Sequence, residues 1–317
     1  MKKKAQPTPP FRPQEEHTMP GTTRTPHPCD PLARFLSERY VCEAVRMRGG
    51  DTNGAYLLRT PAPRAAKWTQ DAASARTEAL ALRALAGTGV APEPVEYVEP
   101  CAFPAQPSAA GQAPGRPASS GALLVTSFCE GENGQALLDA GDGARVYALL
   151  GGALARLQRV RPPEGLPETP GVRVPGYVPA PLANRLRAAC SPPASGRCLV
   201  HGDFGPHNAL VRPDGLTLLD FEWAHAGSPA EDAAWLCWFT RLHYAPQADS
   251  LLAAFASAYT AAGGTLPAPE TAQACAAQAV CRILVRAENA PEEVRQEWIR
   301  RAEWTLTGCV FLAPKEF

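Results

Sequence analysis

Residues 199–211, LVHGDFGPHNALV, constrain the fold of this chain more than any other segment. Apolar runs lie on both sides of a loop that contains glycine and proline, and the loop holds Asp203 and closes with Asn208. Twelve residues beyond Asn208 a further apolar run, LTLLDFE, reaches Asp220. The turn signal RPDG lies between these runs and predicts two short strands. The sequence therefore places three polar side chains on loops at neighbouring strand ends.

These three side chains supply two carboxylates and one amide oxygen. Such ligands suit Mg²⁺, which prefers oxygen, keeps several waters and usually binds together with substrate phosphates. Phosphoryl transfer to an alcohol also needs a carboxylate that orients the attacking hydroxyl or accepts its proton. Each residue has an ordinary alternative, because Asp and Asn are common turn formers and Asp220 could simply end a strand. The hypothesis depends on the order and spacing of all three.

The N-terminal part of the chain is rich in predicted strands. Residues 1–28 are rich in Pro and Thr without a period, which is typical of a disordered tail, and Met19 is an alternative start to Met1. A similar composition predicts a mobile loop at about residues 100–121. We expect helices at 30–40 and 71–89, the second ending at Gly87 or Gly89, and strands within 42–60, 64–70, 93–99 and 121–131.

The C-terminal part has helical periods. We expect helices at 144–160, 181–190, 229–244, 248–263, 269–289 and 291–312. No internal repeat is apparent. The chain therefore divides into a strand-rich N-terminal lobe, residues 29–127, and a larger helical lobe, residues 128–317.

Composition excludes several classes of protein. The 31 basic and 31 acidic residues cancel, so no overall charge favours nucleic acid or a membrane surface as a partner. No apolar run has the length of a membrane span, and the basic start leads into prolines. The ten cysteines are scattered without a CxxC pair, which favours reduced, structural thiols. We expect a cytoplasmic protein.

The motifs resemble those of a known family. HGDFGPHNALV followed by LLDFE is similar to the H-G-D-x-x-x-x-N loop and D-[FW]-[EDS] strand end of the aminoglycoside phosphotransferase and choline kinase family. GSPAEDAAW, residues 227–235, is similar to a further segment of that family, G-x-P-x-x-D-[LA]-A-W. The resemblance covers about residues 40–310. It implies an α+β, bilobal, protein-kinase-like fold with a small antiparallel sheet in the N-lobe and a helical C-lobe.

The resemblance also implies roles for residues of the loop region. Asp203 would be the catalytic base, and Asn208 and Asp220 would be the magnesium ligands. His201 would brace the loop, and Asp232 would anchor it from a buried position.

A lysine on the third strand, fixed by a glutamate of the next helix, is a further feature expected of such kinases, where it binds nucleotide phosphates. Four of the five lysines lie at the termini and the other twenty-six basic residues are arginine, so Lys67 in RAAKW is an exception. This exception favours a function for Lys67 over a plain surface position. Glu78 follows eleven residues later on the predicted helix, although Glu96 and Glu99 are alternatives.

Other nucleotide contacts have weaker signals. Residues 48–56, RGGDTNGAY, lie where a loop should cover the phosphates, so Thr52 and Asn53 are candidates, with an ordinary hairpin turn equally compatible. LLVTSFCEG resembles the hinge of the family, which implies that backbone groups near Ser127, Phe128 and Cys129 hold adenine.

Several further side chains have open interpretations. Glu222 is a solvated acid, a hydrogen-bond acceptor behind the site, or a substrate contact. His201, His207 and His225 match no common zinc spacing. The later helices carry Trp235, Trp238, Tyr244, Glu288, Trp298 and Trp304, which suit an amine through cation–π contact if they are not simply core residues. Arg282 and Arg286 equally permit an acidic acceptor.

The sequence thus predicts a kinase that uses ATP or GTP with Mg²⁺ to phosphorylate a hydroxyl of a small polar molecule, such as an aminoglycoside, a choline-like amino alcohol or a sugar. The same residues permit two alternatives. One is a catalytically silent nucleotide-binding protein with the same fold. The other is a metal-dependent phosphohydrolase, which would give Lys67 and Glu78 no task. The acceptor and the oligomeric state are not readable from the sequence.

Overall fold

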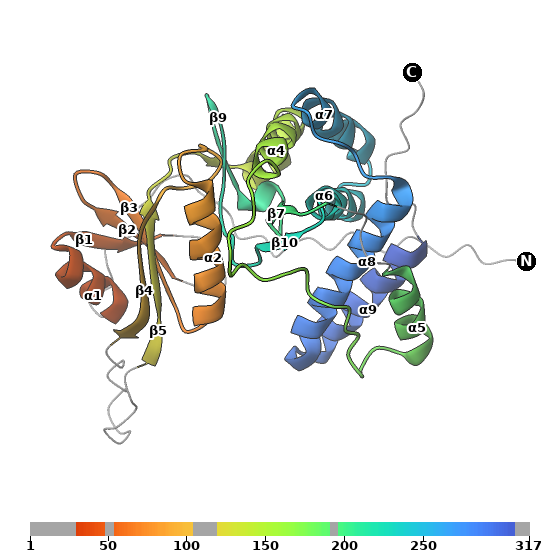
Figure 1. Ribbon diagram of the computed structural model, residues 1–317, viewed down its shortest axis with the longest axis horizontal. Helices are drawn as coiled ribbons and strands as arrows, with labels where there is room; N and C mark the ends of the chain where they lie inside the picture. Colours follow the sequence, from red (N-terminus) through yellow and green to blue (C-terminus); the bar gives the residue numbers. More distant parts are fainter. Residues whose placement is uncertain (1–29, 48–53, 104–118, 191–195, 308–317) are drawn as a thin grey trace, which may run out of the picture.

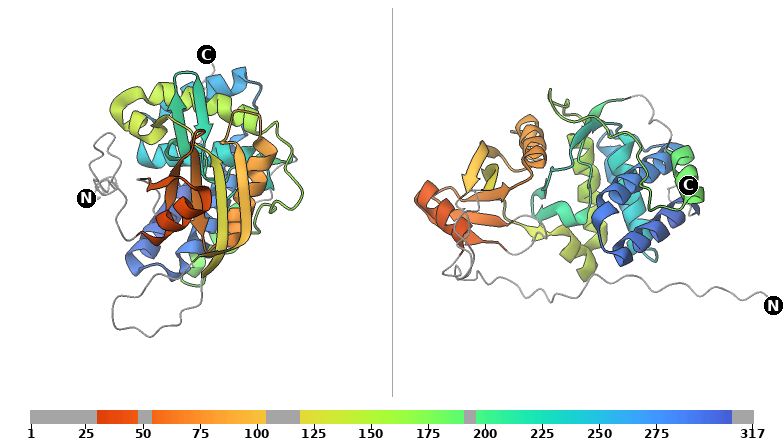
Figure 2. Two further views of the ribbon diagram at one scale, coloured as in Figure 1. Left: turned by 90° about the vertical axis from the view of Figure 1, so that its left-hand side faces the viewer. Right: turned by 90° about the horizontal axis from the view of Figure 1, so that it is seen from below.

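The computed structural model describes residues 30–47, 54–103, 119–190 and 196–307, which form two lobes lying side by side (Figures 1 and 2). The N-lobe contains an antiparallel sheet of five strands in the order β1-β2-β3-β5-β4. These strands are β1 (Glu43–Arg46), β2 (Ala55–Arg59), β3 (Arg64–Thr69), β4 (Pro94–Phe103) and β5 (Ser119–Ser127). The strand-rich N-lobe and the antiparallel sheet agree with the prediction from sequence.

Two helices cover the opposite faces of this sheet. Asp30 caps the first, α1 (Pro31–Tyr40), by accepting hydrogen bonds from the backbone N–H groups of Leu32 and Ala33. The second, α2 (Ala72–Leu85), lies between the sheet and the C-lobe (Figure 1). Strand β5 shows why both faces are buried, since alternate side chains point opposite ways: Leu123 and Val125 pack in the α1 core, and Leu124 packs with α2.

Two predicted boundaries differ from the structure. Helix α2 ends at Leu85, before the predicted glycines, because Gly87 and Gly89 adopt left-handed backbone angles and the Glu93 carboxylate accepts a hydrogen bond from the Gly87 N–H. Residues 100–103 and 119–121, which the sequence assigned to a mobile loop, belong to β4 and β5, and residues 104–118 lie outside the described residues. Their composition suggests a loop, but pairing between the two strands provides the backbone hydrogen bonds.

The C-lobe is mainly helical. Its longer helices are α4 (Gly143–Leu157), α5 (Ala180–Ala189), α6 (Ala230–His243), α7 (Ala248–Ala261), α8 (Pro269–Arg286) and α9 (Glu292–Thr307), and a short helix, α3 (Gly134–Leu137), precedes them. All six predicted helices are therefore confirmed, with α9 described only to Thr307. Gly151 of α4 permits close contact with α7, since a Cβ there would lie 2.5 Å from the Phe255 carbonyl oxygen.

Short strands of the C-lobe carry the loops of interest. They are β6 (Glu132–Asn133), β7 (Cys198–Val200), β8 (Ala209–Arg212), β9 (Gly215–Leu218) and β10 (His225–Gly227). Strands β8 and β9 form the predicted hairpin around the RPDG turn, with Ala209 opposite Leu218. Strand β7, which leads into the loop at residues 201–208, pairs with β10. These pairs bring the loop after β7 beside the loop after β9.

The apolar core joins the two lobes. One cluster includes Leu82 and Leu85 of α2, Leu150 and Leu154 of α4, and Phe221 beyond β9. A second cluster lies wholly within the C-lobe, where α5, α6, α8 and α9 pack around Trp238. The first cluster holds the loop after β9 against both lobes, which fixes the position of the polar residues beside it.

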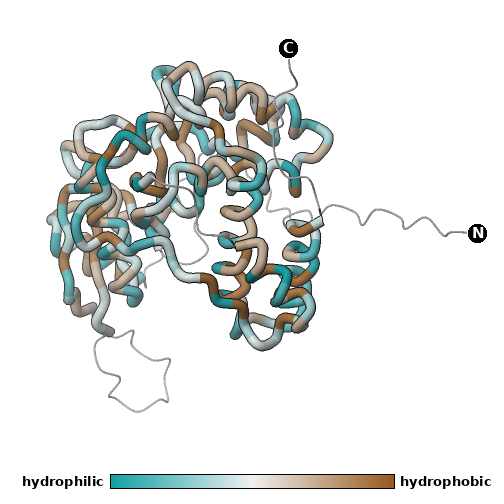
Figure 3. The backbone as a smooth tube through the Cα atoms, turned by 45° about the vertical axis from the view of Figure 1, so that its right-hand side comes forward, coloured by the Kyte–Doolittle hydropathy of each residue, from teal (hydrophilic) through white to brown (hydrophobic). Residues whose placement is uncertain are grey.

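Hydrophobic and hydrophilic segments are interleaved in both lobes (Figure 3). Within the described residues, no helix has the length and apolar character needed to span a membrane. The eight cysteines in the described part of the chain are all free thiols, in agreement with the scattered cysteine spacing.

Candidate active site

Lys67 of β3 joins the two lobes through carboxylates. Its Nζ lies 3.1 Å from Oε2 of Glu78 on α2, 2.7 Å from Oδ1 of Asp220 after β9, and 3.5 Å from Oε2 of Glu222. Burial by itself lowers the pKa of Lys67, but the carboxylates of Glu78 and Asp220 outweigh it and raise that pKa above its usual value. The lysine is therefore a fixed cation at the interface of the lobes.

Glu78 is the predicted partner of this lysine. Its side chain is 9% exposed, so an unpaired charge there would be costly. The two alternatives have other partners: Glu96 pairs with Arg39, and Glu99 pairs with Arg76. Tertiary packing of α2 against the sheet thus selects Glu78.

Asp220 directs its carboxylate toward Lys67 from a left-handed backbone conformation, with φ at 63°. Few residues other than glycine adopt this region, and Asp is among those that tolerate it. Asp220 therefore does more than end a strand, because the chain turns sharply at this residue and presents the side chain to the interlobe cluster.

Asp232 anchors the loop after β7 from the start of α6. Its two carboxylate oxygens accept hydrogen bonds from the backbone N–H groups of His201 (2.8 Å) and Gly202 (3.0 Å). The fully buried His201 ring lies with Nε2 2.9 Å from the Leu219 carbonyl oxygen, so Nε2 carries the proton and Nδ1 accepts from the Asp203 N–H. These bonds fit the bracing roles that the family resemblance implies for His201 and Asp232.

Gly202 allows this loop to approach the segment after β9. Its φ is 86°, and a Cβ at this position would lie 2.3 Å from the Trp223 carbonyl oxygen. Both facts require glycine. The close approach sets Asp203 beside the segment that contains Asp220 and Glu222.

Asp203 is held by three donors. Trp235 Nε1 lies 3.2 Å from its Oδ1, and His207 Nε2 and Asn208 Nδ2 lie 3.2 Å and 3.0 Å from its Oδ2. Burial alone would raise the pKa of Asp203, but the hydrogen bonds and positive charge around it outweigh burial and lower the pKa to about 2. Asp203 is therefore an oriented carboxylate that stays ionised at neutral pH.

Sequence reasoning assigned no catalytic-loop role to Trp235 or His207. Trp235 is the last residue of the GSPAEDAAW segment and His207 lies within the loop itself, so both belong to the motifs. Neither residue type by itself predicts a hydrogen bond to a carboxylate. The bond from Trp235 also shows that this indole faces Asp203 from α6.

Asn208 and Asp220 are the two magnesium ligands that the family resemblance implies. Asn208 donates its side-chain N–H groups to the backbone and carboxylate oxygens of Asp203, which leaves its amide oxygen as an acceptor. The backbone carbonyl of Asn208 accepts a hydrogen bond from the Leu219 N–H at 2.8 Å, so Asn208 lies next to the residue before Asp220. The Asp220 side chain is 43% exposed. An amide oxygen and an accessible carboxylate fit Mg²⁺, which needs few protein ligands when phosphates complete its shell.

In the described residues, no group of three or more His, Cys, Asp or Glu is arranged to hold a metal ion. The three histidines have separate partners: His201 contacts Leu219, His207 contacts Asp203, and His225 contacts Glu231. A cation between Asn208 and Asp220 would thus depend on ligands brought by the substrate.

The hinge candidates differ in their available groups. The Ser127 N–H donates to the Glu93 carbonyl (2.8 Å), and the Phe128 N–H donates to the Pro63 carbonyl (3.0 Å). Neither N–H is free to bind a base in this structure, whereas no hydrogen bond of the Cys129 N–H is found among the described residues. Thr52 and Asn53 lie outside the described residues.

The aromatic residues of the helical lobe are mainly core. Trp235 stacks on Trp238 with ring centroids 4.7 Å apart, and Trp298 and Trp304 also pack against the Trp238 ring. Glu288 is paired with Arg173. The packing therefore agrees with the core interpretation for Trp235 and Trp238, which are both buried.

The two-lobed fold, with a Lys–Glu pair in one lobe facing an acid-bearing loop in the other, is the protein-kinase-like fold. A model of the phosphotransferase enzyme family matches residues 43–275, so the chain belongs to that family. The predicted family and fold are therefore confirmed. No curated protein gives a significant match.

Solved structures show the same fold at low sequence identity. A thermostable mutant of aminoglycoside phosphotransferase APH(4)-Ia, in ternary complex with AMP-PNP and hygromycin B, has a TM-score of 0.63 and 13% identity, over 88% of this chain and 98% of that chain. Amicoumacin kinase hAmiN, in complex with AMP-PNP, Ca²⁺ and Ami, has a TM-score of 0.60 and 12% identity, over 86% and 92% of the two chains. Macrolide 2'-phosphotransferase MphH from Brachybacterium faecium has a TM-score of 0.52 and 20% identity, over 91% and 99%.

Proposed function

We propose that this phosphotransferase moves the γ-phosphate of ATP or GTP to a hydroxyl of a small polar molecule. One observation carries the proposal: Lys67 of the N-lobe bridges the buried Glu78 and the accessible Asp220 of the C-lobe. A lysine fixed in this way is suited to binding nucleotide phosphates. A phosphohydrolase without a nucleotide would have no use for it.

The residues then take distinct roles. Lys67 holds the nucleotide phosphates, with Glu78 fixing its position. Asn208 and Asp220 would hold Mg²⁺, which supplies neutralisation of charge on the transferring group when it is bound. Asp203 orients the acceptor hydroxyl in line and receives its proton late, because a carboxylate with a pKa of about 2 is a weak base.

The similar structures support parts of this proposal. Two of them were solved with AMP-PNP, an ATP analogue, which supports ATP as donor. Their small-molecule companions, hygromycin B and Ami, support a small-molecule acceptor. Several finer points stay predictions: the choice between ATP and GTP, the nucleotide contacts of Cys129, Thr52 and Asn53, the lobe boundary at residues 127–128, and a cytoplasmic location.

The test is a screen for Mg²⁺-dependent turnover of ATP and GTP against pooled amines, sugars, amino alcohols and hydroxy acids. Mass spectrometry identifies any acceptor that has gained a phosphoryl group. Asp203→Asn should lower kcat by about 100-fold or more, the range for removing a positioned general base. Asp214→Asn is the matched control, since Asp214 is an exposed residue of the RPDG turn.

The other functions give distinct results. Phosphate release from simple esters without nucleotide would support a phosphohydrolase. Nucleotide binding without turnover on any acceptor would support a silent binding protein. Near-normal turnover by Asp203→Asn would show that the role given to this carboxylate is wrong.

A further inference from the structure

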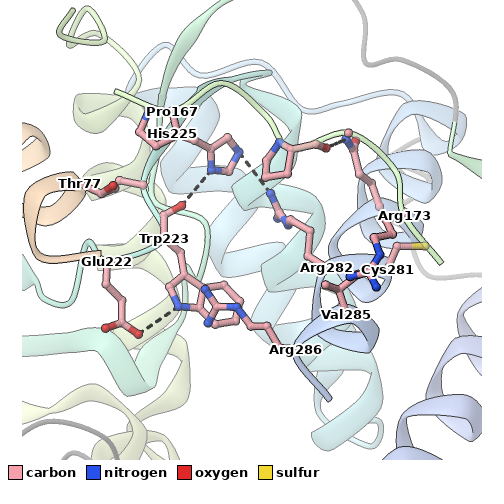
Figure 4. Close-up of a pocket in the computed structure, with 14 residues that line it drawn as sticks. Thr77, Pro167, Arg173, Glu222, Trp223, His225, Cys281, Arg282, Val285 and Arg286 are labelled. Carbon is pink, nitrogen blue, oxygen red and sulfur yellow. Dashed lines mark hydrogen bonds between the residues drawn. The ribbon is translucent and has the colours of Figure 1, made fainter. Parts of the chain in front are cut away.

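A cavity of about 400 Å³ lies beside the candidate active site (Figure 4). Its walls come from the loop at 167–173, the segment 222–225, Thr77 of α2 and the inner side of α8. Glu222 lines the cavity and also lies 3.5 Å from Lys67, so the cavity shares a wall with the interlobe cluster. Its volume is within the range of small-molecule sites.

Arg282 of α8 reaches into this cavity with unused donors. Its side chain is 15% exposed, and it contacts His225 Nε2 (3.3 Å) and Glu231 Oε2 (3.4 Å) through one nitrogen only. A guanidinium has five N–H donors. Within the described segments, Arg241 Nε is the one buried side-chain polar atom without a partner, so the remaining Arg282 donors are not sealed in the protein. They face the cavity.

Glu231 does not neutralise Arg282 fully, because its oxygens already have closer partners. His225 Nε2 lies 2.9 Å from Oε2, and the Ser228 N–H and Thr169 hydroxyl both lie 2.9 Å from Oε1. The carboxylate is thus used chiefly to fix the segment at the end of β10. The contact with Arg282 is the longest of the four.

Arg286 lies one helical turn beyond Arg282, with its guanidinium over an aromatic ring. Its guanidinium carbon is 3.1 Å from the centroid of Trp223 (Figure 4). No carboxylate of the described residues lies within ion-pair distance of it. Burial lowers the pKa of Arg286, while the charges of Glu222 and Asp203 act in the opposite direction, so the guanidinium lies within electrostatic reach of both carboxylates.

The charges around the cavity favour an anion. Arg173 is neutralised by Glu288 at 2.7 Å. Among the described residues that line the cavity, Glu222 is the one carboxylate, and it already contacts Lys67 and accepts from the Trp223 indole at 3.0 Å. A cationic ligand would therefore meet two arginines and no unengaged acid. An anionic ligand would meet two planar guanidinium groups, which suit carboxylate or phosphate.

We propose that the phosphate acceptor is a hydroxylated molecule with an apolar body and an anionic group that Arg282 and Arg286 bind. This proposal rests on the proposed function and specifies its substrate class. The apolar body would pack against Trp223, Val285 and Pro167 of the cavity wall. The hydroxyl oxygen would form a bond to the γ-phosphorus, the bond to the bridging oxygen would break, the nucleoside diphosphate would leave, and the hydroxyl proton would pass to Asp203.

The experiment compares matched acceptors with wild-type protein and Arg286→Gln. Each hydroxylated carboxylate is tested beside its phosphate monoester analogue, its carboxamide and its amine, at saturating Mg²⁺ and ATP. Arg286→Gln removes the charge but keeps a planar polar group. Arg286, unlike Arg282, makes no ion pair with the buried Glu231, so its substitution should destabilise the fold less. Arg300→Gln on the exposed side of α9 is the matched control.

We expect turnover of anionic acceptors in preference to amides and amines. Arg286→Gln should raise the acceptor KM by about 10- to 100-fold, as expected for a lost charge-assisted hydrogen bond, with a smaller change in kcat. Arg286→Lys should recover part of the affinity. The carboxylate and phosphate series show which anion the site prefers.

Three results would overturn the proposal. Amines or neutral acceptors could be turned over while acids are not, which would leave phosphotransfer intact and reject the anionic class. Arg286→Gln could raise the KM for ATP and not for the acceptor, which would assign the arginine to the nucleotide. If no acceptor turns over, calorimetric titration measures the affinity of the same acids for wild type and Arg286→Gln. Equal affinities would reject the anion site. Binding to wild type that is lost in Arg286→Gln would support the anion site and reject only the phosphoryl transfer.

Discussion

Replacing Lys67 by Met separates the structural role of the interlobe cluster from its catalytic role. The substitution removes the ammonium and keeps an unbranched side chain of similar length. It leaves Glu78 as a carboxylate with a 9% exposed side chain, and it leaves Asp220 and Glu222 nearby with no cation between them. Both stability and turnover should fall.

The magnitude follows from burial. Removing one partner of a buried ion pair costs about 3–5 kcal/mol, and we expect about 3 kcal/mol here because the Lys67 side chain is 21% exposed. The double variant Lys67→Met with Glu78→Gln should recover at least about half of that loss, since no buried charge then lacks a partner. It should not recover turnover, because the phosphate-binding cation is still absent.

The loss of stability should also depend on pH. Burial raises the pKa of Glu78 above its ordinary value of 4.5 in the folded protein, and Lys67 acts against that rise, so the pKa of Glu78 should rise further in Lys67→Met. The folded variant then binds a proton more readily than the unfolded chain, so its stability rises as pH falls toward 4.5. The difference in unfolding free energy between wild type and Lys67→Met should therefore shrink on mild acidification.

The assay is denaturant unfolding at several pH values, together with turnover of Mg²⁺–ATP on an identified acceptor. The double variant serves as the control for charge. If Lys67→Met unfolds like wild type, or if Glu78→Gln restores no stability to it, the pair is not the buried contact described. If Lys67→Met keeps wild-type turnover, the lysine does not bind phosphate.

Three further changes test other parts of the structure. Gly202→Ala should abolish turnover and lower the melting temperature, because a Cβ there overlaps the Trp223 carbonyl oxygen; normal values for both would show that the loop does not approach so closely. Gly151→Ala should lower the unfolding free energy by about 1–3 kcal/mol through overpacking of α4 on α7, with unchanged activity per folded molecule, and an unchanged denaturation midpoint would contradict this. His207→Ala should raise the pKa of Asp203 from about 2. Activity needs the ionised carboxylate and is lost as pH falls through that pKa, so the acid limb of the kcat/KM profile should move to higher pH. An unchanged acid limb would show that His207 does not lower the pKa of Asp203.

The local elements were largely predictable from the sequence. The Asp30 cap, apolar periodicity and turn residues mark helices and strands through short-range interactions, which act within a few residues along the chain. The limits of β4 and β5 were not predictable, because their ends are stabilised by each other across a long sequence separation. A Pro- and Ser-rich composition reports the preference of the isolated segment only.

The candidate site divides in the same way. The spacing of Asp203, Asn208 and Asp220, and the isolation of Lys67 among arginines, were sufficient to nominate these residues. The sequence alone could not choose Glu78 over Glu96 and Glu99.

What the sequence determined by itself is the set of chemical groups and the order in which the chain presents them. The tertiary structure decided their partners: Trp235 on Asp203, and Arg286 on Trp223 beside the cavity. Contacts of this kind join residues that are far apart in the chain, and their geometry depends on how α6 and α8 pack. The physical reason is that hydrogen bonds and charge interactions require atoms within a few ångströms, and packing alone sets that distance.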